Sequence, residues 1–385
     1  MNIILGSHYY HPHIGGIESV VQLHAKKLAE RGHDVTVITT DIGAEDHESE
    51  RNGYNIKRYR AWNPFESIGI PYPIPDFVEA RQKMNSLIKG SDVDIVHLHG
   101  LNYLTTTAML LGLPTDIPVI IHQHTPFVEY SWPAKCVEII NDNIVGRWNL
   151  QSADLVCCVT EEIQQYVTQL DGEIDTTLLM NGVESDRFHP RRGSKESVLN
   201  CDSDTVAAFS LSRMSEKKGV DVLLNTVKKF KDYSKSIQFF IAGDGPMSGE
   251  VIQVASEHDN VEYLGSLSDK ELKEYYSAAD VFLFTSKSGE AFPTLTMIEA
   301  YASGTPVIAS SLSKAPDGVE VGDNTILVSP NDENELIDAL TTLAHNQTQL
   351  DRMSIEARTS AEQYFSIKSR IDRLESLYES VIAAN

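Results

Sequence analysis

The sequence has few of the features that mark secreted or membrane-spanning proteins. Its 385 residues include four cysteines, Cys136, Cys157, Cys158 and Cys201, and no pair has the C-x-x-C spacing of metal or redox motifs. We therefore expect reduced, structural cysteines. No apolar run approaches the roughly 20 residues that a membrane-spanning helix needs, and no basic stretch followed by an apolar signal region opens the chain. These absences predict an intracellular, cytoplasmic protein.

Positive charge is also scarce. The chain has 32 Lys and Arg residues against 55 Asp and Glu residues, which gives a formal net charge of −23. This sign of charge argues against a nucleic-acid partner and against simple electrostatic attraction to anionic lipid. A 41% share of hydrophobic residues is typical of a globular protein, and 385 residues are many for one core, so we expect two domains. Because the acidity is spread along the chain, adaptation to high salt is a further hypothesis.

The most informative stretch is 286–310, which predicts a loop, a helix, a turn and a strand. The apolar run 280–284 before it suits a strand that is covered on both faces, as in parallel sheets. We place the helix start near 293–296, where proline fits the first turn and threonine can cap the helix. Gly304 should end the helix before the next strand.

Two glutamates in this stretch are candidate ligand-binding residues. Glu299 is the one carboxylate of an otherwise uncharged helix and shares a face with Leu295 and Ala302, so it should be shielded from water and need a partner. A structural pair and a bond to ligand hydroxyls explain it equally well. Glu290 lies on the loop beside the helix N-terminus, whose free N–H groups favour an anion such as a phosphate.

The N-terminal segment predicts a βαβ unit. A strand over 2–5, a glycine-containing loop, a helix to about residue 30 and a strand over 35–39 follow one another. Gly15 and Gly16 at the helix entrance would let the backbone approach a diphosphate closely, although a plain tight turn explains the pair as well.

Other candidate residues follow predicted strands. His124 follows a strand over 118–121, at the edge where open parallel sheets bind ligands, although a lone histidine is more often structural. Arg213 and Lys218 follow a strand over 206–211 and can converge on one anion; a solvated helix start is the alternative. A glycine-rich turn that could approach a nucleotide follows the strand over 237–242 and consists of Gly243, Asp244, Gly245 and Pro246.

Two further stretches are ambiguous. Asp92 and Asp94 have the D-x-D spacing of some metal sites but precede a strand over 95–99, so we interpret them as a strand-entry cap and predict no metal. We expect the histidines within that strand to belong to the core. A proline-rich stretch has interleaved aromatic residues, which suit either stacking on a sugar or apolar chain or packing within a surface loop: Trp62, Phe65, Tyr72 and Phe77.

The pattern Glu-x-Phe-Pro followed by Leu-x-Met-Ile-Glu-Ala-x-Ala-x-Gly-x-Pro-Val-Ile-Ala resembles the signature of the family 4 glycosyltransferases. Eight residues, 291–298, separate the two glutamates, where that family usually has seven. The resemblance covers nearly the whole chain and is strongest over 206–310. It implies the α/β GT-B fold, in which two Rossmann-like domains with parallel sheets face each other across a cleft. The implied domains are an acceptor-side domain at 1–185, a nucleotide-sugar-binding domain at 186–365, and a C-terminal helix at 366–385 that crosses back to the first domain.

The resemblance also implies an activity: metal-independent, retaining transfer of a hexose from a UDP- or GDP-linked donor to a hydroxyl acceptor. The acceptor would be a glycan, a polysaccharide or a lipid-linked sugar, the last with peripheral contact at the cytoplasmic face of a membrane. No resident cofactor is expected. His124 would contact the donor sugar, Glu290 its hydroxyls or the developing oxocarbenium ion, and Glu299 the ribose. Arg213 and Lys218 would neutralise the diphosphate, and the other donor-binding residues would be Gly15, Gly16, Gly243, Asp244, Gly245, Phe292, Pro293, Thr294 and Leu295.

Two other functions stay open at this point. A sugar phosphorylase or a nucleotide-sugar epimerase can share the double-Rossmann plan, although a phosphorylase also needs a lysine for a bound cofactor, and no such motif is evident. A non-catalytic nucleotide-sugar-binding subunit is the other alternative, and the extra residue between Glu290 and Glu299 favours it.

Overall fold

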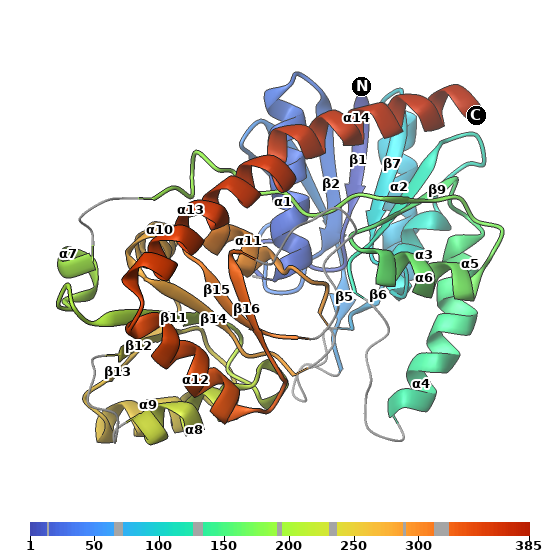
Figure 1. The fold of residues 1–385 in the computed structure, drawn as a ribbon. Helices are drawn as coiled ribbons and strands as arrows, with labels where there is room; N and C mark the ends of the chain where they lie inside the picture. The colour runs from blue at the N-terminus through green and yellow to red at the C-terminus, as the bar shows by residue number, and fades with distance from the viewer. Residues whose placement is uncertain are drawn as a thin grey trace. The chain divides into compact units, whose positions relative to one another are not determined.

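The chain folds into two compact units. The first consists of Met1–Asn181 and Ser369–Asn385, and the second of Gly182–Lys368. The structure, a computed structural model, describes residues 1–13, 15–64, 72–125, 134–190, 195–230, 237–287, 290–311 and 323–385, with the backbone alone at 134–137. Both units alternate strands and helices along the chain (Figure 1).

The first unit is built on an eight-stranded sheet in the order β10-β9-β8-β7-β1-β2-β4-β3, in which only the β3–β4 pair is antiparallel. The strands are β1 (Asn2–Gly6), β2 (Asp34–Thr40), β3 (Glu48–Arg51), β4 (Tyr54–Tyr59), β7 (Ile95–His99), β8 (Val119–Gln123), β9 (Leu155–Cys158) and β10 (Thr176–Leu178), with a separate ribbon of β5 (Ala61–Trp62) and β6 (Ile74–Pro75). The helices are α1 (Gly16–Glu30), α2 (Phe77–Gly90), α3 (Leu104–Leu110), α4 (Ala134–Asn141), the π-helical turn η2 (Asp142–Gly146), α5 (Arg147–Leu150), α6 (Glu161–Leu170) and α14 (Ile367–Ala384).

The second unit has a six-stranded, all-parallel sheet in the order β13-β12-β11-β14-β15-β16. Its strands are β11 (Val206–Leu211), β12 (Ile237–Ala242), β13 (Val261–Gly265), β14 (Val281–Phe284), β15 (Val307–Ser310) and β16 (Thr325–Val328). Its helices are α7 (Lys195–Leu199), the 3-10 turn η3 (Glu216–Lys218), α8 (Val220–Phe230), α9 (Ser248–Glu257), α10 (Asp269–Ala278), α11 (Leu295–Ala302), α12 (Glu333–Ala344) and α13 (Gln347–Tyr364).

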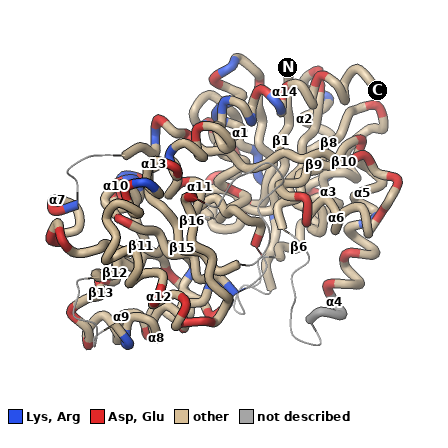
Figure 2. Tube along the Cα trace, viewed as in Figure 1, with Lys and Arg blue, Asp and Glu red and all other residues tan. Residues whose placement is uncertain are grey.

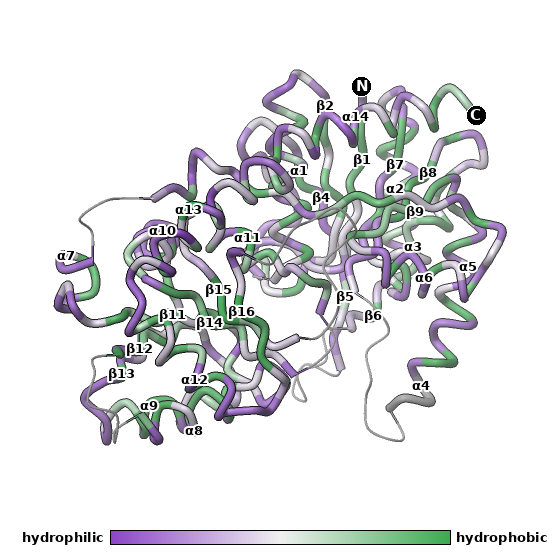
Figure 3. Tube along the Cα trace, in the orientation of Figure 1, coloured by the Kyte–Doolittle hydropathy of each residue, from purple (hydrophilic) through white to green (hydrophobic). Residues whose placement is uncertain are grey.

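Local sequence explains these elements well. All four residues of β14 are buried, as expected for a central parallel strand with helices on both faces. Figure 3 shows the same apolar character along the strands of both sheets. Helix α10 begins with a capping box between Ser268 and Glu271, and the Thr160 side chain caps α6. Asp94 accepts a hydrogen bond from the backbone N–H of Asn2 at 2.7 Å, so it secures a strand entrance as the sequence suggests.

Each sheet has one point where the strand order reverses. In the first unit the chain moves outward from β1 to β2 and β4, then returns to β7 on the other side of β1. In the second unit it moves from β11 to β12 and β13, then returns to β14 beside β11. Open α/β sheets bind ligands outside the carboxyl ends of the strands at such switch points. The loops after β1, β7, β11 and β14 are therefore the expected ligand-binding positions.

Other features bear on class and location. Asp and Glu residues are spread over both units (Figure 2). Among the helices that the structure describes, none has the length and apolar character needed to cross a membrane. Cys157, Cys158 and Cys201 are free and buried, and burial raises the pKa of the Cys158 thiol to about 12, which confirms their structural character. The side chain of Cys136, and the candidate aromatic residue Phe65, lie outside the described residues.

Candidate functional site

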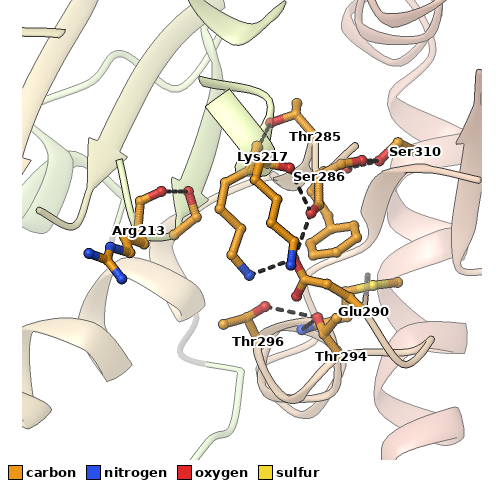
Figure 4. A network of polar contacts seen from close by, with 12 residues as sticks. Arg213, Lys217, Thr285, Ser286, Glu290, Thr294, Thr296 and Ser310 are labelled. Atoms are coloured by element: carbon orange, nitrogen blue, oxygen red, sulfur yellow. Dashed lines mark hydrogen bonds and ion pairs between the residues drawn. The ribbon is translucent and has the colours of Figure 1, made fainter. Parts of the chain in front are cut away.

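The second unit gathers several predicted site residues at its switch point. Arg213 and Lys218 follow β11, Glu290 follows β14, and these two strands are paired neighbours. Lys218 and Glu290 are 72 residues apart in sequence, so their contact results from the strand order rather than from any local motif. Figure 4 shows the loops side by side.

Lys218 and Glu290 form the centre of this arrangement. The Lys218 Nζ atom lies 2.5 Å from Glu290 Oε1, and the Ser286 hydroxyl donates to the same oxygen at 2.6 Å. The Lys218 and Glu290 side chains are 29% and 16% exposed, so both can still be reached from solvent. The family resemblance implies that Lys218 binds the diphosphate of a donor and that Glu290 binds its sugar. In the structure these two residues contact each other directly.

Backbone contacts hold the two loops together. Gly219 ends η3 with φ at 68°, and a Cβ atom there would lie 1.9 Å from the carbonyl oxygen of Thr285. The Thr285 hydroxyl donates to the carbonyl of Lys218 at 3.0 Å, and the N–H of Lys287 donates to the carbonyl of Lys217 at 2.9 Å. The backbone of Lys218 is thus held by contacts that a glycine at 219 permits.

Arg213 does not share this position. Its side chain is exposed, and in Figure 4 its guanidinium points away from Lys217 and Glu290. The convergence of Arg213 and Lys218 on one anion therefore stays a prediction. The role of Arg213 at a diphosphate stays a prediction.

The glycine-rich turn after β12 packs against the loop that carries Arg213. Cβ atoms at Gly243 and Gly245 would lie 1.9 Å from the carbonyl of Ser212 and 2.6 Å from that of Met214. Asp244 accepts hydrogen bonds from the Ser248 hydroxyl and the Gly245 N–H, and these bonds hold its pKa below the ordinary value. The close approach that these glycines permit is therefore to protein backbone, and their contact with a nucleotide stays a prediction.

Helix α11 begins beside Glu290. Phe292 and Pro293 are buried, and Thr294 is the N-cap, whose hydroxyl accepts from the N–H of Met297 at 3.4 Å. The first helical residue is Leu295, within the range that the sequence predicts. The free N–H groups of this turn and the Lys218 ammonium provide positive potential on one side of the Glu290 carboxylate.

Glu299 lies in the second turn of α11 and is half-buried. Burial raises the pKa of Glu299 to about 7, and the positive charge of Arg187 opposes the rise. The nearby Tyr276 hydroxyl also lowers the pKa of Glu299. Tyr276 is buried, and its hydroxyl forms no hydrogen bond of ordinary length with the described residues. Glu299 thus changes charge near neutral pH, and the cation that the sequence leaves unnamed is Arg187.

In the first unit, Gly15 and Gly16 begin α1, as the sequence predicts. The Glu18 side chain folds back onto Gly15, where a Cβ atom would lie 2.3 Å from a carboxylate oxygen, whereas a Cβ at Gly16 would meet nothing within 4 Å. Burial favours a raised pKa for Glu18, but bonding to His13 and its own N–H and the nearby His8 bring the pKa below the ordinary value. A protein carboxylate therefore already faces this helix N-terminus.

His124 directly follows β8 and belongs to a cluster of buried imidazoles. Its Nε2 lies 2.8 Å from Nδ1 of His99, and its ring stacks on that of His99 at 5.1 Å. His122 on β8 is paired in register with His99 on β7. Burial lowers the pKa of His124, His99 and His122 well below the ordinary value, and neighbouring imidazoles lower it further.

Sequence reasoning treated these histidines singly and missed the cluster. The signal was present: H-x-H occurs at 97–99 and again at 122–124, and alternate residues of adjacent parallel strands share one face of a sheet. A fifth histidine, His24, comes from α1, and its ring centre lies 5.9 Å from that of His99. Burial lowers the pKa of His24 to about 4.

Comparisons with known proteins match both units. Residues 14–187 match the family described as Glycosyltransferase Family 4, and residues 206–346 match Glycosyl transferases group 1. The alpha-monoglucosyldiacylglycerol synthase of Acholeplasma laidlawii is 24% identical over an alignment covering 100% of this chain and 98% of that protein. The phosphatidylinositol N-acetylglucosaminyltransferase gpi3 subunit of Schizosaccharomyces pombe is 25% identical, with 98% and 80% covered.

Solved structures agree on the fold. Sucrose-phosphate synthase from Thermosynechococcus elongatus superposes with a TM-score of 0.80 at 20% identity, covering 100% of both chains. Anabaena HepE in complex with UDP-glucose gives a TM-score of 0.74 at 17% identity, covering 99% of this chain and 100% of that one. The prediction of a GT-B fold is confirmed.

The first prediction concerns Gly219. Gly219→Ala places a methyl group against the Thr285 carbonyl in a left-handed conformation, so we expect a loss of roughly 3 kcal/mol or more in unfolding free energy. Gly265 has φ at 63° with nothing within 4 Å of a Cβ, so Gly265→Ala isolates the backbone strain alone, about 1 kcal/mol. Urea unfolding of both variants measures the difference. Equal losses would show that the Thr285 contact is not restrictive.

The second prediction concerns the pH dependence of stability. The pKa of Glu299 is raised to about 7 in the folded chain from 4.5, so the native state binds more protons between these values and stability falls as pH rises through them. Glu299→Gln removes this fall. Relative to wild type, the variant should gain on the order of 1–3 kcal/mol between about pH 5 and pH 8.

Urea midpoints at several pH values test this expectation. Glu196→Gln, at an exposed position of the same unit, is the matched control, and its difference from wild type should stay constant with pH. A Glu299→Gln difference that is equally constant would contradict the raised pKa.

Proposed function

The chain belongs to the family 4 glycosyltransferases, and from this membership we propose that it transfers a hexose from UDP to a hydroxyl group of a lipid headgroup. We further propose that the anomeric configuration is retained and that no metal ion takes part in catalysis. The observation that carries the proposal is the Lys218–Glu290 pair at the β11/β14 switch point, next to the N-terminus of α11.

The choice of donor is supported by the chemistry of the loops and by related structures. The Lys218 ammonium and the free N–H groups of α11 attract a diphosphate. Glu299 is a hydrogen-bond acceptor for ribose hydroxyls once it is ionised. Anabaena HepE has been solved with UDP and with UDP-glucose, which favours uridine over guanosine as the base.

The Lys218–Glu290 contact suggests how donor binding would free the Glu290 carboxylate. An incoming diphosphate competes with Glu290 for the Lys218 ammonium, because both are anions within reach of one cation. Once Lys218 turns to the phosphate, the Glu290 carboxylate is free to accept hydrogen bonds from sugar hydroxyls. It also stabilises positive charge as the sugar becomes an oxocarbenium-like species.

In this scheme the departing phosphate accepts the acceptor's proton, and the acceptor attacks C1 on the face that the phosphate leaves, so the anomeric configuration is retained. The bond between sugar C1 and the β-phosphate oxygen breaks, and negative charge develops on UDP, where Lys218 stabilises it. The departing phosphate oxygen accepts the proton of the acceptor hydroxyl, and the acceptor oxygen bonds to C1 on the face that the phosphate leaves. UDP departs carrying that proton, so the reaction balances without a separate protein base. The parts of Arg213, His124 and the Gly15–Gly16 turn in this scheme stay predictions.

A lipid acceptor is supported by an exposed apolar surface on the first unit. Helix α4, η2 and α5 run consecutively (Figure 1) and expose Ile139, Ile140, Ile144 and Trp148. Large apolar side chains gathered on one short segment are unusual at a purely aqueous surface and are suited to the interface of a bilayer. The names of several relatives also specify lipid products or substrates, among them a monoglucosyldiacylglycerol synthase and a phosphatidylinositol N-acetylglucosaminyltransferase subunit.

The third prediction tests the donor site. Calorimetric titration of UDP, GDP and ADP should show tightest binding for UDP. Lys218→Met removes one charge-assisted contact with the diphosphate and should weaken UDP binding roughly 10- to 100-fold. Lys217→Met, at the exposed neighbouring position, is the matched control and should stay within about twofold. Equal binding by both variants would remove Lys218 from the site.

Turnover then separates the competing functions. Incubation with UDP-glucose and a panel containing diacylglycerol, phosphatidylinositol and glycan acceptors should release UDP and form a product whose anomeric proton coupling in NMR matches that of the donor. An inverted product would refute retention. Release of inorganic phosphate would favour a phosphorylase, and tight UDP binding without any transfer would favour a non-catalytic subunit.

The fourth prediction tests the membrane contact. We expect the chain to float with neutral phosphatidylcholine vesicles and less with vesicles rich in phosphatidylglycerol, because its net charge is −23. Ile140→Ser with Ile144→Ser should reduce flotation at least about tenfold, since each isoleucine contributes about 1–2 kcal/mol on burial. Ile252→Ser with Ile355→Ser, at exposed positions of the second unit, is the matched control. If both double variants float alike, the α4–α5 segment is not the contact.

A further inference from the structure

Five buried histidines lie together in the first unit: His24 on α1, His97 and His99 on β7, His122 on β8, and His124 just after β8. The ring centres of His24 and His122 are 6.1 Å apart, and those of His99 and His122 are 5.3 Å apart. In three of these rings, His24, His99 and His122, one nitrogen lies within 4.8 Å of one nitrogen in each of the others.

The hydrogen bonds of this cluster leave nitrogen atoms unsatisfied. His122 Nε2 lies 3.1 Å from the carbonyl of Leu179, which can only accept, so Nε2 carries the proton and Nδ1 has a lone pair. That Nδ1 is buried without a hydrogen-bond partner. His99 uses Nδ1 toward His124, and its Nε2 has no partner; Nδ1 of His24 has none either. Buried polar atoms without a partner are rare and need an explanation.

We propose that His24, His99 and His122 bind a divalent metal ion of the zinc class in the interior of the first unit. Three imidazole nitrogens suit Zn²⁺, and also Co²⁺, Ni²⁺ or Cu²⁺, whereas Mg²⁺ and Ca²⁺ prefer oxygen ligands. Metal–nitrogen bonds of about 2.1 Å place tetrahedral ligand atoms roughly 3.4 Å apart, so a ligand pair at the 4.8 Å limit closes by small side-chain movements. A water molecule fills the fourth position.

The surrounding contacts match those of known metal sites. A ligating histidine usually donates its other ring N–H to a carbonyl or to another side chain, which fixes the tautomer that binds the metal. His122 does this with the carbonyl of Leu179, and the 2.8 Å contact between His99 Nδ1 and His124 Nε2 allows His99 to do the same. The tautomer of His122 therefore leaves its Nδ1 lone pair available for a metal.

The metal would connect α1 to β7 and β8, so its function is structural.

The metal would also affect His124, and this effect matters only if His124 contacts the donor sugar, which rests on the proposed function. When Nε2 of His99 binds a metal, its Nδ1 must carry the proton and donate to Nε2 of His124. The remaining proton of a neutral His124 then lies on its Nδ1. The metal would thus fix which nitrogen of His124 can donate to a ligand.

The fifth prediction is that the chain binds one such ion. The full-length protein, without a histidine tag, is expressed in cobalt-supplemented medium, and its metal content is measured by mass spectrometry. We expect about one ion per chain, with the intense visible absorption of four-coordinate Co²⁺. Removing the ion with a strong chelator after partial unfolding should lower the thermal midpoint, and Zn²⁺ should restore it.

Variants locate the ion. His24→Gln with His122→Gln should lose the bound ion and the visible bands, whereas His345→Gln, at an exposed position of the second unit, should keep both. The wild-type spectrum decides the matter even if the double variant fails to fold. Metal content below about 0.1 per chain, six-coordinate Co²⁺, or loss of the metal in His345→Gln would overturn the proposal, and none of these outcomes bears on UDP binding by the second unit.

Discussion

The close approach of two backbone segments, at Gly219 and Thr285, is the constraint on which the candidate site depends. Parallel strands β11 and β14 leave their carboxyl ends side by side, and the loops that follow must share limited space. A glycine in the left-handed region lets η3 lie against the Thr285 carbonyl, and the side chain and backbone hydrogen bonds of 285–287 complete the contact. Lys218 is the last residue of η3, so this contact holds its backbone, and the Glu290 carboxylate holds its ammonium.

The two glutamates of the site are held in different electrostatic environments as a result. Glu290 accepts from an ammonium and a hydroxyl, which compensate its negative charge. For Glu299 on α11, burial raises the pKa to about 7, although the positive charge of Arg187 opposes the rise. Glu290 can therefore exchange its contact with Lys218 for another partner. Glu299 can ionise near neutral pH when hydroxyl groups donate hydrogen bonds to it. Glu290 and Glu299 lie on either side of the start of α11 and differ in their surroundings, so they can act differently toward a ligand.

How much the sequence predicts depends on whether a feature is local. The predicted strands 95–99, 206–211 and 237–242 have the bounds that the structure gives, because each is a short, mostly apolar run next to polar or turn residues. The Lys218–Glu290 contact joins residues 72 apart, and no local pattern encodes it. The antiparallel edge strand β3 was also not foreseen, since its sequence, ESER, has no apolar alternation. The placement of Arg213 shows the same limit, because spacing on a loop does not determine side-chain direction.

The histidine cluster illustrates a different reason why single-residue reasoning fails. Each histidine of β7 and β8 is an ordinary core residue when taken alone, and only the register that pairs His99 with His122 brings the rings together. Burial keeps all of them uncharged, so no charge pattern in the sequence reveals the group. What distinguishes the cluster is the direction of its hydrogen bonds. The carbonyl of Leu179 can only accept, so it places the proton of His122 on Nε2 and leaves Nδ1 with a buried lone pair that has no hydrogen-bond partner. A cation is the partner that satisfies several such lone pairs at once, because a neutral donor can satisfy only one per hydrogen.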